Sequence, residues 1–318
     1  MQNKSSKKNK LLSAAAILAA LSLCLGGFFV FRSAEKASSG VNAQAPLNSP
    51  QTHFFSGGID NEEAGISLSA QSAIMIEAGS GEVVYSKNPD QRMPMASTTK
   101  IMTALVALEN CDLQKKVTVS RDATNIEGSS IYLYPGEEMT MLDLLYGMML
   151  ESATDAAAAI AIEIGGDIEG FADMMNEKAR ALGLENTHFD NPHGLDSEEH
   201  YTTARELAII AREAYSHPKF KEIASTLKKT IPLDGDEGAR LLINHNKLLR
   251  RYEGATGIKT GFTKKSGRCL VSSARKDSLE FIAVTLNSPD DWNDHKKMLD
   301  LGFSRYESRT LCLSGEPI

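Results

Sequence analysis

Residues 73–86 read Ala-Ile-Met-Ile-Glu-Ala-Gly-Ser-Gly-Glu-Val-Val-Tyr-Ser, two short apolar runs around a glycine-rich turn. Aliphatic and aromatic residues in runs of this length predict two strands, Ala73–Glu77 and Val83–Ser86. Gly79-Ser80-Gly81 supplies the turn between them, so the stretch predicts an antiparallel hairpin. An antiparallel sheet is therefore expected to begin here.

Downstream of the hairpin, helical patterns dominate. Apolar residues recur at helical spacing after Ser97, and Thr140 to Asp143 resembles a capping box that opens another helix. Further helices are predicted over 153–164, 168–182, 203–215 and 291–302, and strands over 270–273 and 281–286. Strands near both ends with helices between them predict an α+β fold: an antiparallel sheet flanked by helices, with a helical subdomain over roughly 115–220.

The N-terminal region differs in composition from the rest. A basic tail, residues 1–10, precedes the uncharged and mostly apolar run Leu11–Phe31. As a helix this run would be about 31 Å long, enough to cross one hydrocarbon core, so it is expected to be a transmembrane anchor or a signal segment. Residues 32–65 are rich in small and polar residues and are expected to form a flexible stem, followed by a folded domain over 66–318.

Charge and the scattered histidines narrow the possible partners. The chain carries a net charge of −7 and has no basic stripe, which argues against a nucleic-acid partner. Its basic N-terminal flank predicts export, either to the outer face of the cytoplasmic membrane or, if the segment is cleaved, into the medium. His188 and His193 accompany Asp190 but lack the spacing of a metal-binding helix, so no metal or cofactor is expected.

Ser97-Thr98-Thr99-Lys100 is the first candidate catalytic group. Residues three apart at a helix start share a face, so the Lys100 amine can reach the Ser97 hydroxyl. A serine hydroxyl needs an adjacent base, and a buried lysine can be that base if its pKa is depressed. Ser-x-x-Lys also occurs roughly once by chance in a chain this long. The alternative is a helix cap followed by a surface lysine.

Lys259-Thr260-Gly261 is the second group, expected between a glycine-marked turn and a strand. The lysine supplies a cation, the threonine a hydroxyl and the glycine room for a ligand backbone, a combination suited to a substrate carboxylate. A phosphate-binding loop over 254–260 is excluded because Ile258 replaces the glycine that must precede the lysine.

Ser152-Ala153-Thr154-Asp155 is the third group, at the junction of two predicted helices. A serine at this junction could pass a proton between Lys100 and a leaving amine. By itself it would be an ordinary helix cap.

Together and in this order, the three groups form the set found in penicillin-binding proteins and class A β-lactamases. The chain resembles the D-alanyl-D-alanine carboxypeptidases along nearly all of residues 66–307. The matching stretches are 94–100, Asn191-Pro192-His193-Gly194-Leu195, 200–204, 244–249 and Gly257-Ile258-Lys259-Thr260-Gly261-Phe262-Thr263.

The resemblance implies a serine peptidase that removes the terminal D-alanine of peptidoglycan stem peptides and is covalently inhibited by β-lactam antibiotics. It implies that Ser97 is acylated, that Lys100 is its general base and that Ser152 relays protons. The resemblance also implies that Lys259, Thr260, Gly261 and Thr154 bind the substrate. The backbone amides of Ser97 and Phe262 would form the oxyanion hole.

Two departures from the family pattern leave alternatives open. Thr154 occupies the position where the family's triplet usually has asparagine, so one substrate contact is in question. The β-rich second domain and C-terminal amphipathic anchor of many relatives do not follow the peptidase domain, which gives the N-terminal segment more importance as an anchor. A β-lactamase of the same fold would need a deacylating carboxylate, for which only Glu151 is adjacent. A catalytically weak muropeptide- or penicillin-binding protein is the other alternative.

Overall fold

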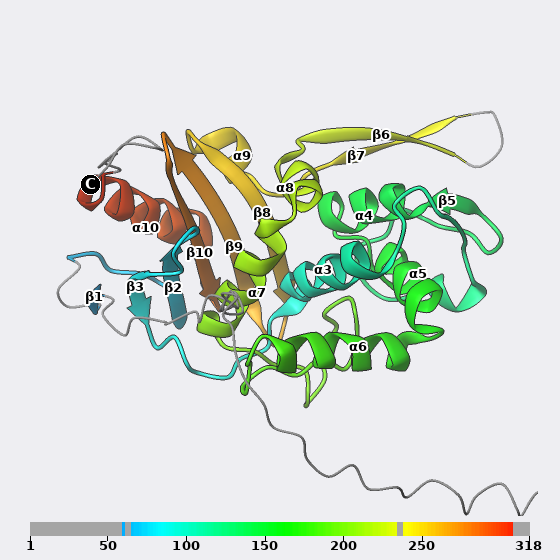
Figure 1. The fold of residues 1–318 in the computed structure, drawn as a ribbon, viewed down its shortest axis with the longest axis horizontal. Helices are drawn as coiled ribbons and strands as arrows, with labels where there is room; N and C mark the ends of the chain where they lie inside the picture. The colour runs from blue at the N-terminus through cyan, green and yellow to red at the C-terminus, as the bar shows by residue number, and fades with distance from the viewer. Residues whose placement is uncertain (1–58, 61–64, 234–237, 308–318) are drawn as a thin grey trace, which may run out of the picture. The chain divides into compact units, whose positions relative to one another are not determined.

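The structure is a computed structural model that describes residues 59–60, 65–233 and 238–307. Its centre is a six-stranded sheet with the order β1-β3-β2-β10-β9-β8 (Figure 1). All neighbouring strands are antiparallel except the pair β1–β3. The strands are β1 (Ile59–Asp60), β2 (Ser72–Glu77), β3 (Val83–Lys87), β8 (Ala255–Thr263), β9 (Gly267–Lys276) and β10 (Leu279–Leu286).

The predicted hairpin is confirmed as β2–β3, with Met75 opposite Tyr85. On its other side β2 pairs with β10, where Met75 faces Ala283. Strands from the two ends of the folded region therefore meet in the middle of the sheet. The predicted α+β fold, an antiparallel sheet flanked by helices, is confirmed.

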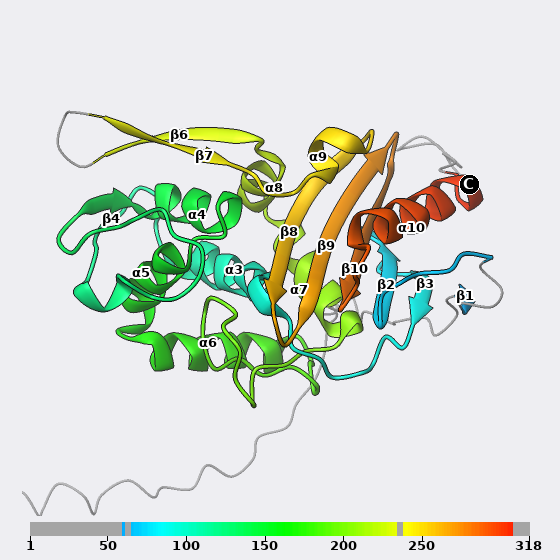
Figure 2. The same ribbon diagram turned by 180° about the vertical axis from the view of Figure 1, so that it is seen from behind.

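Between β3 and β8 the chain forms a largely helical region (Figures 1 and 2). Its helices are α3 (Lys100–Asn110), α4 (Met141–Leu150), α5 (Thr154–Gly165), α6 (Ile168–Ala181), α7 (Ala204–Ser216), α8 (Pro218–Ser225) and α9 (Leu248–Arg251). Two short ribbons, β4 (Lys116–Thr118) with β5 (Glu138–Thr140) and β6 (Lys228–Pro232) with β7 (Ala239–Ile243), and the 3-10 turns η1 (Ala96–Thr99) and η2 (Arg121–Ala123) complete it.

Helices cover both faces of the sheet. The C-terminal helix α10 (Asp291–Arg305) lies on one face, where both ring nitrogens of His295 hydrogen-bond to hydroxyls of Ser272 and Thr285. Helix α7 packs on β2 and β10 from the other face. The larger hydrophobic core lies on this second face, among α3, α4, α5 and the sheet, so the helical region and the sheet are held by one continuous core.

Three features differ from the sequence-based expectations. Lys259-Thr260-Gly261 lies inside β8 instead of before a strand, because Gly257, expected in the preceding turn, is itself a strand residue. The ribbon β6–β7 was not predicted. Ile59–Asp60, within the predicted stem, forms β1 beside β3. The predicted membrane segment Leu11–Phe31 lies outside the described residues, and none of the described helices is both long and apolar enough to span a bilayer.

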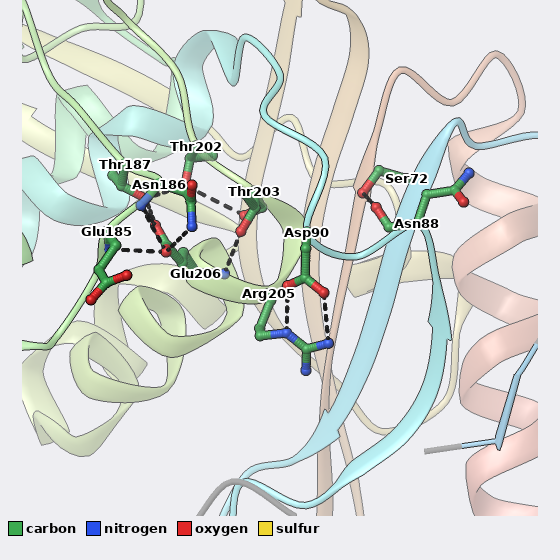
Figure 3. A network of polar contacts seen from close by, with 10 residues as sticks. All are labelled: Ser72, Asn88, Asp90, Glu185, Asn186, Thr187, Thr202, Thr203, Arg205 and Glu206. Atoms are coloured by element: carbon green, nitrogen blue, oxygen red, sulfur yellow. Dashed lines mark hydrogen bonds and ion pairs between the residues drawn. The ribbon is translucent and has the colours of Figure 1, made fainter. Parts of the chain in front are cut away.

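A polar network fastens the loop before α7 to that helix (Figure 3). Thr203 caps α7 by accepting from the Glu206 amide. The Glu206 carboxylate in turn accepts from the Asn186 amide and from the Thr187 hydroxyl. The neighbouring Arg205 makes two hydrogen bonds to Asp90, at 2.6 and 3.1 Å. This network holds both ends of the 186–203 loop, whose middle reaches the site described below.

Candidate active site

Ser97 lies in η1, immediately before the first turn of α3. Ala96 has a φ of +48°, a conformation that residues with a side chain rarely adopt. The Thr99 hydroxyl donates to the Ala96 carbonyl at 2.7 Å and stabilises this turn. As a result Ser97 is partly exposed while the residues on both sides of it are buried.

Two glycines allow other segments to approach the Ser97 turn closely. A Cβ atom at Gly261 of β8 would lie 3.1 Å from the backbone nitrogen of Ser97. A Cβ atom at Gly194 would lie 2.0 Å from the Ala96 carbonyl oxygen, and Gly194 has a φ of +89°. Any other residue at Gly194 would collide with the turn, and one at Gly261 would press on it.

The Lys100 side chain is completely buried beneath Ser97. Its Nζ lies 3.0 Å from Ser97 Oγ and donates to the His193 carbonyl at 2.6 Å. Burial lowers the pKa of Lys100 well below its ordinary value, and the positive charge of Lys259 lowers it further. The negative charge of Asp155 opposes this shift in pKa only in part. The structure thus brings the predicted nucleophile and base into direct contact.

Lys259 and Ser152 form a second contact of the same kind. Lys259 Nζ donates to Ser152 Oγ at 3.0 Å and to the Thr260 carbonyl at 2.9 Å. Lys259 is 1% exposed, and burial lowers its pKa to about 7. Ser152, between α4 and α5, has a φ of +60°, so its turn is a second strained backbone position in the site.

The two lysines lie near enough for their charges to repel. Burial lowers the pKa of both amines, and the charge of Lys259 lowers that of Lys100 further. A lowered pKa makes an amine easier to deprotonate, which suits the predicted role of Lys100 as a base. Lys259, with a pKa of about 7, stays partly charged near neutral pH, which suits its predicted role as a cation.

The carbonyl that Lys100 contacts belongs to a loop whose role was not predicted. Asn191 Oδ1 accepts from the Gly194 amide at 2.7 Å, and Asn191 Nδ2 donates to the Leu195 carbonyl at 3.0 Å. The Thr103 hydroxyl of α3 donates to the Pro192 carbonyl at 2.5 Å. These bonds fix the His193 carbonyl over Lys100. The Asn-Pro-x-Gly pattern was a signal for such a side-chain-stabilised turn.

A buried histidine supports the same turn from behind. His200 Nδ1 accepts from the Asp190 amide, and His200 Nε2 lies 2.8 Å from the Thr99 hydroxyl. Burial lowers the pKa of His200 to about 4, so the ring is neutral at physiological pH. With Nδ1 as acceptor, Nε2 carries the proton and donates to Thr99. The ring therefore orients the Thr99 hydroxyl toward Ala96.

Thr154 is the first residue of α5 and is 4% exposed. Its amide donates to the Ser129 carbonyl at 2.7 Å. A Cβ atom added at Gly128 would lie 2.7 Å from the hydroxyl oxygen of Thr154, so only a glycine fits beside it. Among the described residues this hydroxyl has no hydrogen-bonding partner. The next residue, Asp155, accepts from the Ser130 hydroxyl at 2.6 Å. Thr154 thus packs against a neighbouring loop at the edge of the site.

Thr260, Gly261 and Phe262 continue the site along β8. Thr260 and Gly261 are half-buried, and Phe262 is exposed. Strand β8 is an edge of the sheet, so one side of it is open to an added chain. Gly261 lies against the Ser97 amide, and Phe262 is the next residue along this edge strand, so the segments of both predicted oxyanion-hole amides come close together.

The side chains of the other candidate groups have partners of their own outside the Ser97–Lys100 and Ser152–Lys259 contacts. Glu151 accepts from the Ile243 amide and pairs with His245 Nε2 at 3.0 Å. His188 Nδ1 lies 2.7 Å from the Glu199 carbonyl, and His193 Nδ1 accepts from the Leu195 amide. In the part of the chain that the structure describes, no cluster of three or more histidine, cysteine or acidic side chains could hold a metal ion.

Comparisons with known proteins agree with this arrangement. The family model for D-alanyl-D-alanine carboxypeptidases matches residues 59–290. D-alanyl-D-alanine carboxypeptidase DacF of Bacillus subtilis is 40% identical over 250 residues, covering 76% of this chain and 64% of the relative. D-alanyl-D-alanine carboxypeptidase DacB2 of Mycobacterium tuberculosis is 33% identical, covering 74% of this chain and 82% of the relative.

A solved structure extends the likeness to the fold. The crystal structure of the Streptomyces K15 DD-transpeptidase superposes with a TM-score of 0.72 at 33% identity. The match covers 75% of this chain and 98% of that structure. The matched family model extends over most of the described sheet and over every residue placed in the site above. The chain therefore belongs to the D-alanyl-D-alanine carboxypeptidase family.

Proposed function

We propose that this chain is a serine D-alanyl-D-alanine carboxypeptidase that removes the terminal D-alanine of peptidoglycan stem peptides. The observation that carries the proposal is the fully buried Lys100 amine, with its lowered pKa, in contact with the Ser97 hydroxyl. An amine whose pKa is lowered loses its own proton more readily and can then accept the proton of a hydroxyl, which a charged lysine cannot.

Acylation follows from the contacts. The neutral Lys100 amine keeps its donated bond to the His193 carbonyl, while its lone pair accepts the proton of Ser97. Ser97 Oγ attacks the carbonyl of the penultimate D-alanine, and the oxygen that gains charge is held by the amides of Ser97 and Phe262. Each such donor is typically worth about 3 kcal/mol of transition-state stabilisation. The proton then passes by way of Ser152 to the leaving D-alanine amine.

Lys259 and Thr260 hold the substrate's terminal carboxylate. Binding an anion next to Lys259 favours its charged form, so the substrate itself raises the pKa of this lysine from about 7. The charged Lys259 in turn keeps the nearby Lys100 neutral. Binding of the substrate carboxylate to Lys259 thus favours the neutral form of Lys100, the base. The hydrogen bond between Lys259 and Ser152 connects the carboxylate-binding lysine to the serine that passes the proton to the leaving amine.

Water then hydrolyses the acyl-enzyme on Ser97. Relatives carry the names carboxypeptidase and endopeptidase, and the solved structure that of a transpeptidase, so the family differs in substrate and in acyl acceptor. A β-lactamase needs a carboxylate that activates water beside the ester. Glu151 bonds to Ile243 and His245 instead, which favours the carboxypeptidase.

Release of D-alanine from diacetyl-L-lysyl-D-alanyl-D-alanine tests the proposal. The natural protein should release D-alanine with turnover and should form a slowly hydrolysed adduct with benzylpenicillin. Rapid hydrolysis of penicillin would instead identify a β-lactamase, and a penicillin adduct without D-alanine release would identify a catalytically weak binding protein.

The family acts on the cell wall outside the cytoplasm, and we propose that Leu11–Phe31 carries this chain there and anchors it to the outer face of the membrane. The length and the basic flank of this segment support that role. Fractionation of cells that express the full chain should place penicillin-labelled protein in the membrane. Labelled protein found only in the medium would indicate that the segment is cleaved.

A further inference from the structure

Few large apolar side chains are exposed in the described chain, and they fall on three parts of it. Tyr132 and Tyr134 lie in the 127–137 loop, Leu227, Leu241 and Ile243 in the β6–β7 ribbon and the residue before it, and Phe262 in β8. On β7, Leu241 and Ile243 alternate with Arg240, which contacts the loop, so they point to the opposite side of the ribbon. The two tyrosines, here called the loop surface, are therefore the exposed apolar residues of the loop itself.

Tyr132 is the most exposed of them. It is 85% exposed and has a φ of +59°, although it carries a large side chain. Its neighbours Ile131 and Leu133 are buried and anchor the loop, so Tyr132 and Tyr134 alternate to the outside. A large aromatic residue in a left-handed conformation with its ring in solvent costs stability, and the ring itself makes no aromatic or cation–π contact among the described residues.

An ion pair within the fold holds Tyr132 in place. Arg240 of β7 donates to the Ile131 carbonyl at 2.8 Å and to the Tyr132 carbonyl at 3.1 Å. The same guanidinium pairs with Glu137, whose side chain is fully buried. Paired and largely desolvated charges of this kind fix one geometry. The ribbon and the loop therefore form one rigid unit that presents Tyr132.

This unit is continuous with the catalytic centre at two points. The Ser129 carbonyl accepts from the Thr154 amide, two residues after Ser152. On the ribbon side the Ile243 amide donates to Glu151, the residue before Ser152. Tyr132 is three residues from Ser129, a span of at most about 11 Å. The three stem-peptide residues that precede the terminal D-alanyl-D-alanine reach about as far when extended.

We propose that the loop surface, with Tyr132 as its main contact, binds the part of the stem peptide that precedes the two terminal D-alanines. This inference rests on the proposed function and adds a specificity-determining residue to it. Tyr132 contacts the peptide's apolar backbone and side-chain methylene groups through its ring face. Short substrates and penicillins do not extend to this surface, so they should not depend on Tyr132.

The test compares two substrates in three forms of the full chain. The substrates are diacetyl-L-lysyl-D-alanyl-D-alanine and a complete stem pentapeptide, and the proteins are the natural chain, Tyr132→Gly and Tyr132→Phe. Glycine adopts a φ of +59° without strain, so Tyr132→Gly removes the ring without endangering the fold.

We expect kcat/KM for the pentapeptide to fall about tenfold in Tyr132→Gly, as when a central interface tyrosine is truncated. The short peptide and the rate of penicillin acylation should change less than about twofold, and Tyr132→Phe should resemble the natural chain.

Three results would overturn the inference. An unchanged ratio of pentapeptide to short-peptide kcat/KM in Tyr132→Gly would show that the ring contacts no substrate. An equal fall for both substrates and for penicillin would show that the residue positions the Ser152 turn instead. If the natural chain released D-alanine from neither substrate, the proposed function would fail first and this inference with it.

Discussion

Lys100 and Lys259 are alike in their surroundings and differ in what those surroundings do. Each is buried, and each amine bonds to one serine hydroxyl and one backbone carbonyl. Burial lowers the pKa of both, but Lys100 also experiences the charge of Lys259. Lys100 is moreover itself the first residue of α3, where the helix dipole disfavours a cation, whereas Lys259 lies in a strand and only its amine, through Ser152, approaches the start of α5.

The difference shows how one residue type can fill two roles in one site. The lysine at the helix start has its pKa lowered by burial and by a second charge, which suits a base, while the lysine in the edge strand remains available as a cation for a carboxylate. Neither role follows from burial alone, since both side chains are equally buried. The second charge and the helix start make the distinction.

Arginine at each position gives the largest expected contrast. A guanidinium cannot lose its proton at any accessible pH, so Lys100→Arg should lower the penicillin acylation rate by about 10³-fold or more, as much as Lys100→Ala. Lys259→Arg should remain within about a hundredfold of the natural rate, because that position needs positive charge. Stopped-flow acylation with benzylpenicillin measures both. Equal tolerance of arginine at the two positions would contradict the separate roles.

The pH dependence of kcat/KM separates the lysines in another way. If Lys259 must be charged to bind a carboxylate, kcat/KM should fall as the pH rises and Lys259 loses its proton. The midpoint of this fall should lie below 10.5, the ordinary pKa of lysine, and close to the pKa of about 7 that Lys259 has in the fold. The fall approaches tenfold per pH unit for one required proton. In Lys259→Arg this limb should disappear, since arginine stays charged. A limb unchanged in Lys259→Arg would assign it to another group.

Stability should change with pH in the opposite sense. The pKa of Lys259 is about 7 in the folded chain and near 10.5 when unfolded, so the unfolded state binds more protons between these values. The free energy of unfolding therefore rises with pH in this window, by up to about 1.4 kcal/mol per pH unit for this group. Lys259→Met lacks this contribution. Urea unfolding of the two proteins between pH 7.5 and 9.5 should show the steeper rise in the natural chain, and parallel curves would argue against a depressed pKa.

Thr154→Asn is expected to have the smallest effect. It adds an amide beside the Ser152–Lys259 pair, where the Thr154 hydroxyl has no partner within the described residues. We expect acylation by penicillin to stay unchanged or to rise by up to about threefold, since one more hydrogen bond contributes about 1 kcal/mol or less. Thr154→Ser is the control for the lost methyl group. A slower asparagine variant with a lower Tm would show that the position close to Gly128 is overfilled.

Local signals in the sequence predicted local structure well. The β2–β3 hairpin and the cap of α4, where the Asp143 amide donates to Thr140, are both formed as expected, because each depends on neighbouring residues. The position of Lys259 inside β8 was missed, because Gly257 reads as part of a turn until its pairing with Ser273 of β9 is known.

The sequence also predicted which residues would meet, but not what surrounds them. Ser97 and Lys100 are three residues apart, so their contact follows from helix geometry. The His193 carbonyl over Lys100 and the Arg240 clamp on Tyr132 join segments 93 and 108 residues apart in the chain. Such contacts depend on how the helical region packs, and the packing of distant segments cannot be predicted from short sequence patterns.

The mass of the protein after exposure to benzylpenicillin tests the central claim most directly. The natural chain should gain the mass of one penicillin, and peptide mapping should place it on Ser97. Ser97→Ala should gain none while keeping its Tm, because the buried Lys100 amine keeps its bond to the His193 carbonyl when the hydroxyl is removed. A penicillin adduct in Ser97→Ala, or an adduct mapped to Ser152 in the natural chain, would contradict the assignment of Ser97 as the nucleophile activated by Lys100.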